Sequence, residues 1–215
     1  MNFPVERAVQ HVAAGTAPLV IGEAFILEGV PAVVLGVVAY FYFYSFSFWF
    51  PTMLKRLSGF SDSTVGLLGA LPLVAAAVAM QLNGWHSDRT GERHWYAAVP
   101  SFIAAVALCV LVVQPQSMAL SLLLFTLVGV SSAYISAFWA LPTEILSQSS
   151  AAAAVGMINA VGSVTGFAGP YLFGYLNTTT GSFSAGLAVM MVAALSGGLL
   201  MLAVPRNTHM AGAAR

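Results

Sequence analysis

The chain has 215 residues, of which seven are basic and seven acidic, so that charged residues make up 7% of the sequence. A soluble domain carries roughly 25%, whereas apolar residues here reach 59% and the mean hydropathy is +0.88. So few charges disfavour a soluble enzyme and a disordered chain, and the lack of a basic excess disfavours a nucleic-acid binder. The single cysteine, Cys109, excludes an internal disulfide and a cysteine-based metal cluster. The composition therefore predicts an integral membrane protein, surrounded by membrane lipid and with no nucleic acid as a partner.

Six apolar segments are each long enough to cross a bilayer core, which takes about 20 residues in a helix. The sequence therefore predicts an all-α membrane protein, a six-transmembrane-helix bundle within residues 24–205, followed by a tail over 206–215. Within residues 1–23, Gly15 and Pro18 interrupt a mildly apolar stretch from His11 to Gly22, and we expect a poorly defined interfacial segment. The alternative is a seventh span, which would reverse one terminus. The six predicted spans cover, approximately, residues 30–50, 64–84, 96–114, 117–140, 151–176 and 183–204.

Basic residues in the connecting loops predict the orientation of the chain, because cytoplasmic loops carry an excess of Lys and Arg. Arg89 and Arg93 follow the second span, whereas Lys55 and Arg56 follow the first. If the loop with Arg89 and Arg93 is cytoplasmic, both termini are cytoplasmic too, because the number of spans is even. We therefore expect a protein integral to the inner (plasma) membrane with both termini and the tail in the cytoplasm.

The middles of the predicted spans contain no Asp, Glu, Lys or Arg. Carriers coupled to protons or sodium ions usually keep an ionisable group inside the membrane for the ion. The Gly-x-x-x-x-Gly-Lys-[Ser/Thr] loop of ATP-driven proteins is absent as well. The four histidines show no metal-ligand spacing, and no His or Asp accompanies the serines of the spans. The sequence therefore predicts no metal site, no cofactor and no enzyme.

Neutral polar and aromatic residues share faces on three of the predicted helices, because spacings of three and four residues return to the same face. The stripes lie on the first span (Tyr40, Tyr44, Phe48), the fourth (Ser132, Ser136, Trp139, Thr143) and the fifth (Asn159, Ser163, Gly166, Pro170). Together they predict a shared aqueous cavity, and Asn159 supports it most strongly because hydrocarbon cannot satisfy a side-chain amide. The alternative is close helix packing, which uses small and hydroxyl residues without any ligand.

A short loop between the second and third spans carries the most specific motif. Residues 84–93 read Gly-Trp-His-Ser-Asp-Arg-Thr-Gly-Glu-Arg, which is Gly-x-x-x-Asp-Arg-x-Gly-x-Arg. Gly91 supplies a turn, and Arg89 and Arg93 suit carbonyl groups or lipid headgroups. We expect Asp88 to lie against a helix N-terminus, where unpaired N–H groups and the helix dipole favour negative charge. The alternative is a plain hydrophilic loop.

This loop resembles the cytoplasmic loop signature of the major facilitator superfamily. Residues 46–52, 86–95, 138–143 and 158–170 are similar to the anion:cation symporter branch, which carries organic anions such as tartrate, glucarate, galactonate and phthalate, usually with protons. Members have twelve helices in two halves, and residues 42–204 resemble helices seven to twelve, the C-terminal half. Residues 25–39 resemble the start of helix six, and we expect one continuous helix through this junction.

The resemblance also implies a site and a function. In sugar-acid carriers, side chains of helices ten and eleven meet the substrate, which implies Ser136, Trp139 and Asn159, with Tyr44 on helix seven. The implied conformational latch consists of Gly84, Asp88, Arg89, Gly91 and Arg93. The carboxylate-binding arginine and the protonatable acids of the family lie in the N-terminal half. We therefore expect a truncated or half-length carrier for small organic anions that needs a second copy or an N-terminal half. The alternative is a non-transporting membrane remnant or packing partner.

Overall fold

Six helical rods make up the described part of the protein, so the predicted fold class is confirmed. The computed structural model describes residues 30–113, 117–145 and 148–204, and the predicted segments 1–23 and 206–215 lie outside the described residues. The fourth rod is interrupted by the short 3-10 helix η2. In chain order the elements are α3 (Val30–Ser58), α4 (Asp62–Thr90), α5 (His94–Val112), α6 (Met118–Val130), η2 (Ser131–Ala133), α7 (Tyr134–Ile145), α8 (Gln148–Thr180) and α9 (Ser184–Ala203).

Four rods are long and apolar enough to cross a membrane: α4, α5, α9, and Met118–Leu141 of the rod formed by α6, η2 and α7. The 29 residues of α4 extend over about 43 Å at 1.5 Å per residue, more than the ~30 Å of a bilayer core. The predicted residues Tyr44 and Asn159 lie on the other two rods, α3 and α8.

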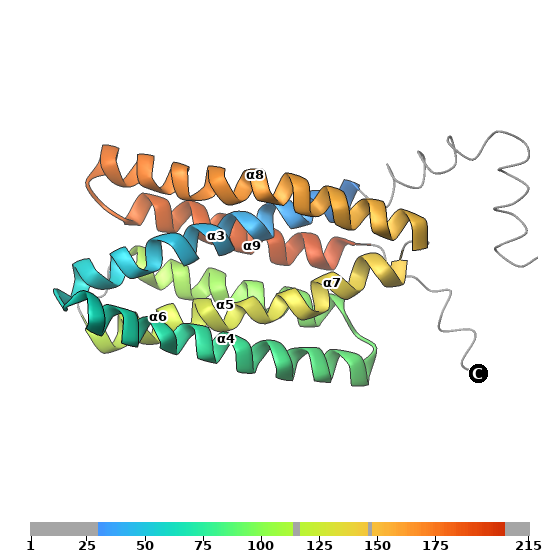
Figure 1. Ribbon diagram of the computed structural model, residues 1–215, viewed down its shortest axis with the longest axis horizontal. Coiled ribbons are helices and arrows are strands. Elements are labelled where there is room, and N and C mark those ends of the chain that lie inside the picture. The colour runs from blue at the N-terminus through green and yellow to red at the C-terminus, as the bar shows by residue number, and fades with distance from the viewer. Residues whose placement is uncertain (1–29, 114–116, 146–147, 205–215) are drawn as a thin grey trace, which may run out of the picture.

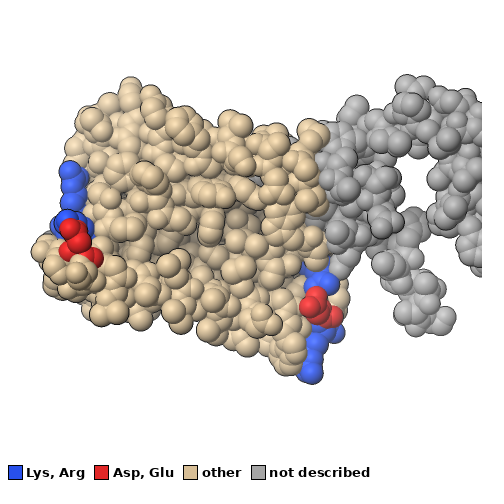
Figure 2. All heavy atoms as spheres, in the orientation of Figure 1, with Lys and Arg blue, Asp and Glu red and all other residues tan. Residues whose placement is uncertain are grey.

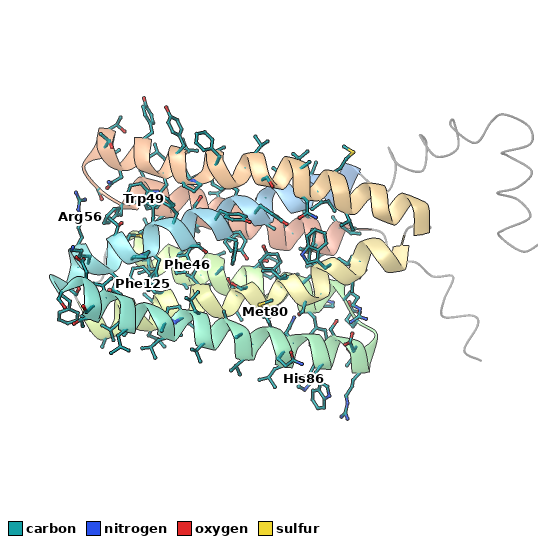
Figure 3. The ribbon with its side chains drawn as sticks, in the orientation of Figure 1. Phe46, Trp49, Arg56, Met80, His86 and Phe125 are labelled. Atoms are coloured by element: carbon teal, nitrogen blue, oxygen red, sulfur yellow. The ribbon has the colours of Figure 1, made fainter. Side chains whose placement is uncertain are left out.

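The rods form two groups that pack against each other (Figure 1). In this view α3, α8 and α9 lie on one side of the bundle, and α4 lies with the rod of α6 and α7 on the other. Aromatic rings join the groups: the ring centre of Phe125 on α6 is 6.2 Å from that of Phe46 and 5.2 Å from that of Phe50. Figure 3 shows Phe46 and Phe125 between the two groups. These buried rings fix α3 against α6 and so hold the polar residues of α3 in place.

The charged side chains that the structure describes gather at the two ends of the bundle, and Figure 2 shows an uncharged body between them. At one end Lys55 forms an ion pair with Asp62, and Arg56 lies over the ring of Phe183. The charged residues of the other end are Asp88, Arg89, Glu92 and Arg93. Charges that are confined to the ends of apolar helices are typical of a bundle that spans a membrane.

Buried serines are satisfied mainly by their own helices. Ser45 donates to the carbonyl of Phe41 at 2.6 Å, and Ser121 donates to the carbonyl of Ser117 at 3.1 Å. Each bond runs one turn back along the helix, so the buried hydroxyl finds an acceptor within its own rod. For these serines the structure supports the packing interpretation.

The fourth rod changes its winding at η2. Ser131 is fully buried and donates to the carbonyl of Val128 at 2.5 Å, three residues back. A 3-10 helix has 3.0 residues per turn instead of 3.6, so three residues of it rotate the following face by about 60°. Residues before and after η2 therefore do not keep the register of one continuous α-helix.

Candidate functional site

A hydrogen bond between α3 and α8 lies at bilayer depth. The hydroxyl of Tyr40 donates to Oδ1 of Asn159 at 2.9 Å, and Nδ2 of Asn159 donates to the carbonyl of Val155 at 3.0 Å. Tyr40 lies ten residues into α3 and Asn159 eleven residues into α8, which places both about 15–17 Å from the ends of their helices. Asn159 is exposed. Its amide is therefore held in place and remains accessible from outside the described bundle.

Tyr44 and Trp139 lie beside this pair. Both line one small cavity of about 90 Å³, together with Tyr40 and Tyr134, and the ring centres of Tyr40 and Tyr44 are 5.5 Å apart. Tyr44 is 42% exposed, so the cavity opens beside Asn159. Three of the four predicted binding residues, Tyr44, Trp139 and Asn159, thus lie together around Tyr40. The sequence analysis placed Tyr40 on the same helix stripe as Tyr44 but did not predict it as a binding residue.

Ser136 faces another helix. Its hydroxyl donates to the carbonyl of Ala133 at 2.9 Å and accepts from the amide of Asn83 on α4 at 3.3 Å. Ser132 instead lines a separate cavity of about 230 Å³ between α3 and α4. The predicted stripe on the fourth span therefore does not form a single face, because η2 rotates the helix between these residues. The side chain of Thr143 lies outside the described ones.

Glycines of α8 form a close seam with α3, which we call the glycine seam: Gly162, Gly166, Gly169 and Gly174. A Cβ atom on Gly162 would lie 2.9 Å from the ring of Tyr40, and one on Gly166 would lie 3.2 Å from the ring of Tyr44. Hydrogen bonding adds to the seam, because Nε1 of Trp49 donates to the carbonyl of Pro170 at 2.9 Å. Figure 3 shows Trp49 between α3 and α8. The missing side chains let the tyrosines of α3 lie against α8 beside Asn159.

Asn83 is a structural residue that the sequence analysis missed. Its Nδ2 donates to the carbonyl of Ala133 in η2 at 2.8 Å and to the carbonyl of Tyr96 in α5 at 2.9 Å. One amide on α4 thereby joins three elements. The signal in the sequence is a lone Asn at the end of an apolar run, which must find partners inside the membrane.

The loop motif is ordered by hydrogen bonds among its own residues. Gly91 has a φ of 67° and ends α4, and its N–H donates to the carbonyl of Ser87 at 2.9 Å. Oδ1 of Asp88 lies 2.5 Å from Nη1 of Arg93, and the same nitrogen donates to the hydroxyl of Ser87 at 3.0 Å. The guanidinium of Arg89 lies over the ring of Trp85, 4.0 Å from its centre. The motif thus builds a defined turn.

Two motif positions have roles that differ from those expected. Oε1 of Glu92 accepts from the backbone N–H groups of His94 at 3.1 Å and Trp95 at 3.3 Å. Glu92 therefore caps the N-terminus of α5. The carboxylate of Asp88, which we expected against a helix N-terminus, is instead paired with Arg93. A Cβ atom on Gly84 would lie 3.3 Å from Cβ of Ser136. Gly84 therefore allows α4 to approach α7 closely.

Apolar rods long enough to span a bilayer, charges at both ends and a polar face at bilayer depth define an integral membrane protein of several spans. Residues 32–214 match the family model described as Major Facilitator Superfamily. The chain therefore belongs to the Major Facilitator Superfamily, a family of transporters, as its loop motif indicated.

The chain is also similar to curated transporters. A protein of Agrobacterium vitis named as a tartrate transporter is 36% identical over 166 residues, which are 77% of this chain and 36% of that protein. The quinolone resistance transporter of Acinetobacter baumannii is 30% identical, over 73% of this chain and 36% of that protein. The inner membrane transport protein RhmT of Escherichia coli is 31% identical, over 78% of this chain and 39% of that protein. The matches span between a third and two fifths of each relative.

Proposed function

We propose that this chain forms one six-helix half, the C-terminal half, of a secondary carrier for small organic anions. It lies in the inner membrane with both termini in the cytoplasm. The proposal rests mainly on one observation, the exposed Asn159 that Tyr40 holds at bilayer depth. An amide facing hydrocarbon costs several kcal/mol. This face therefore meets water, a ligand or another protein surface in place of lipid.

The chemistry of the face suits a hydroxylated carboxylate. The bond to Val155 uses one N–H of the Asn159 amide, and among the described residues no second acceptor lies within hydrogen-bond distance of Nδ2. The free N–H can donate to a carboxylate or hydroxyl oxygen of a ligand. The rings of Tyr44 and Trp139 offer apolar surface to the carbon skeleton. A sugar acid or a similar dicarboxylate, the class that the name of the tartrate transporter indicates, presents both kinds of surface.

A second half is needed to complete the site. Among the side chains that the structure describes, those lining the cavity beside Asn159 are all uncharged, whereas an organic anion needs a positive charge within its site. A second copy of this chain would bring only the same uncharged face. We therefore favour a half that carries basic residues, and alternating access would follow from rocking of the two halves about the midplane. Coupling to protons would likewise depend on acids of that half.

The experiment joins the chain to the N-terminal half of the Agrobacterium vitis relative and reconstitutes the product in proteoliposomes. We expect saturable uptake of labelled tartrate or a related sugar acid, and no uptake by the chain alone. A well-inserted chimera that takes up a quinolone in preference to every carboxylate offered would overturn the choice of substrate. A well-inserted chimera without any uptake would favour the alternative, a non-transporting membrane protein.

A further inference from the structure

A groove of about 560 Å³ opens between α4 and α5. Its α4 wall includes Ala79, Leu82 and His86, and its α5 wall includes Trp95, Val99 and Ile103. The two helices make few contacts with each other, so the rod behind them forms the floor. The groove is separate from the cavity beside Asn159.

The inside of the groove is apolar and lies at bilayer depth. Both walls belong to helices that are long and apolar enough to span a membrane, and Leu82 and Val99 are 55% and 44% exposed. Asn83 is the polar group that reaches the floor, and its amide hydrogens already bond to the carbonyls of Ala133 and Tyr96. The groove therefore offers little to water or to a polar ligand, and a hydrocarbon chain fits its surface.

One end of the groove is polar, aromatic and basic. Spacings of three and four residues place Ala79, Leu82, His86 and Arg89 on one face of α4, so Arg89 continues the groove wall toward the end of the helix. Figure 3 shows His86 near this end of α4. The exposed rings of Trp85 and Trp95 have the amphipathic character that suits the level of lipid headgroups.

Arg89 supplies positive charge at this end. Asp88 is paired with Arg93, and no carboxylate among the described residues lies within ion-pair distance of Arg89, whose guanidinium rests on the ring of Trp85. Along its length the groove is therefore first apolar, then lined or flanked by the rings of Trp85 and Trp95, and finally positively charged at Arg89. A phospholipid has the matching order of acyl chain, ester level and phosphate.

We propose that the groove between α4 and α5 binds one bilayer phospholipid, with an acyl chain between Ala79 and Val99 and the phosphate at Arg89 and His86. This site does not depend on the proposed transport function, because it lies on a different face. It would fill the space between two spans that barely touch, and would place a lipid against the loop motif.

The experiment measures phospholipid retained by the purified full chain, using native mass spectrometry after detergent washing and incubation with phosphatidylglycerol. Ala79→Phe fills the groove, and its matched control is Ala77→Phe, because Ala77 is exposed on the same helix and does not line the groove. We expect one bound lipid in the unchanged chain and in Ala77→Phe, and loss of it in Ala79→Phe. Val99→Phe and its control Val106→Phe repeat the test from α5, in case one variant folds poorly.

The headgroup arm uses Arg89→Gln. Because one basic residue near a membrane surface contributes on the order of 1 kcal/mol, we expect about fivefold weaker retention of phosphatidylglycerol. Retention of diacylglycerol, which lacks the phosphate, should be unchanged by this variant. The proposal is overturned if the unchanged chain retains no lipid, or if the groove-filling variants retain as much lipid as their controls. It is also overturned if detergent alone occupies the groove and phosphatidylglycerol does not displace it.

Discussion

The side-chain amide of Asn83 donates to the carbonyl of Ala133 at 2.8 Å, and this bond ties the end of α4 to the 3-10 helix in the fourth rod. The same amide reaches the carbonyl of Tyr96 on α5. Carbonyls in and beside a 3-10 segment are poorly satisfied by their own helix, because its hydrogen-bond geometry is less favourable than that of an α-helix. Asn83 therefore stabilises the change of winding that separates the face of Ser132 from that of Ser136.

Replacing Asn83 tests this role. Asn83→Leu removes the bonds of this amide to Ala133, Tyr96 and Ser136 while keeping a similar volume. We expect a loss of roughly 1–2 kcal/mol in the free energy of unfolding in detergent. Gln81→Leu is the control, because Gln81 is exposed on the same helix. The fraction of SDS at which the helices unfold gives the measurement. Equal midpoints for the two variants would show that the Asn83 bonds contribute nothing to stability.

The glycine seam makes a sharper prediction. A Cβ atom on Gly169 would lie 2.8 Å from the backbone carbonyl oxygen of Phe41 and would collide with the hydroxyl of Ser45, so α3 and α8 must move apart in Gly169→Ala. We expect a loss of about 1–3 kcal/mol in unfolding free energy. Gly156→Ala is the matched control, since nothing lies within 4 Å of its added Cβ. That variant should be neutral or stabilising by up to about 1 kcal/mol, because Ala favours helix.

Unfolding in SDS again supplies the measurement for both glycine variants. A smaller loss in Gly169→Ala than in Gly156→Ala would show that the seam is looser than these distances indicate. A loss confined to Gly169→Ala would confirm that α3 and α8 approach through their missing side chains.

The number and order of the rods could be predicted from the sequence, because length and hydropathy report burial in a bilayer directly. The positions at which the helices end could not be predicted in the same way. The structure continues α3 to Ser58 and α4 to Thr90, beyond the predicted ends at residues 50 and 84. Hydropathy detects only the part of a helix that lies in hydrocarbon. As expected, the junction near residues 39–44 lies within one continuous helix.

The polar face beside Asn159 was predictable where helices are regular. Tyr44 and Asn159 each lie on an uninterrupted helix, so their spacing reported their faces correctly. Ser136 follows η2, and a spacing rule that assumes 3.6 residues per turn cannot foresee that rotation. The partners of Asn83 are backbone carbonyls on two other rods, and nothing in the identity of Ala133 or Tyr96 marks them as acceptors.

Asn159→Leu is expected to lower substrate binding by the chimeric carrier while leaving membrane insertion unchanged. The change removes the amide that Tyr40 positions, and a buried hydrogen bond to a charged ligand contributes about 1.5–3 kcal/mol, so affinity should fall by at least about tenfold. Tyr40→Phe keeps the ring and removes the hydroxyl, and should weaken binding by a smaller factor. Equilibrium binding of labelled tartrate measures both. Unchanged affinity in Asn159→Leu would leave Asn159 with a packing role only.

The loop motif is tested by comparing two acidic residues that differ in what they hold. Asp88→Asn removes the charge paired with Arg93, whereas Glu92→Gln keeps a carbonyl oxygen that can still cap α5 at the N–H groups of His94 and Trp95. We therefore expect Asp88→Asn to disturb the conformational balance of the carrier more than Glu92→Gln does. Because the Asp88 carboxylate is 70% exposed, the effect should be modest, about two- to fivefold.

The measurement is the alkylation rate of a cysteine on the polar face, Ser163→Cys, in a Cys109→Ala background of the chimeric carrier. Ser163 is exposed on α8, and it lies one turn from Asn159, so its reactivity reports how open that face is to water. The same rate in the Asp88 and Glu92 variants would reduce the motif to a hydrophilic loop without a latch. A larger change in Asp88→Asn than in Glu92→Gln would assign the latch to the Asp88–Arg93 pair. Both substitutions remove one negative charge from the same turn, so the difference between them would not come from net charge.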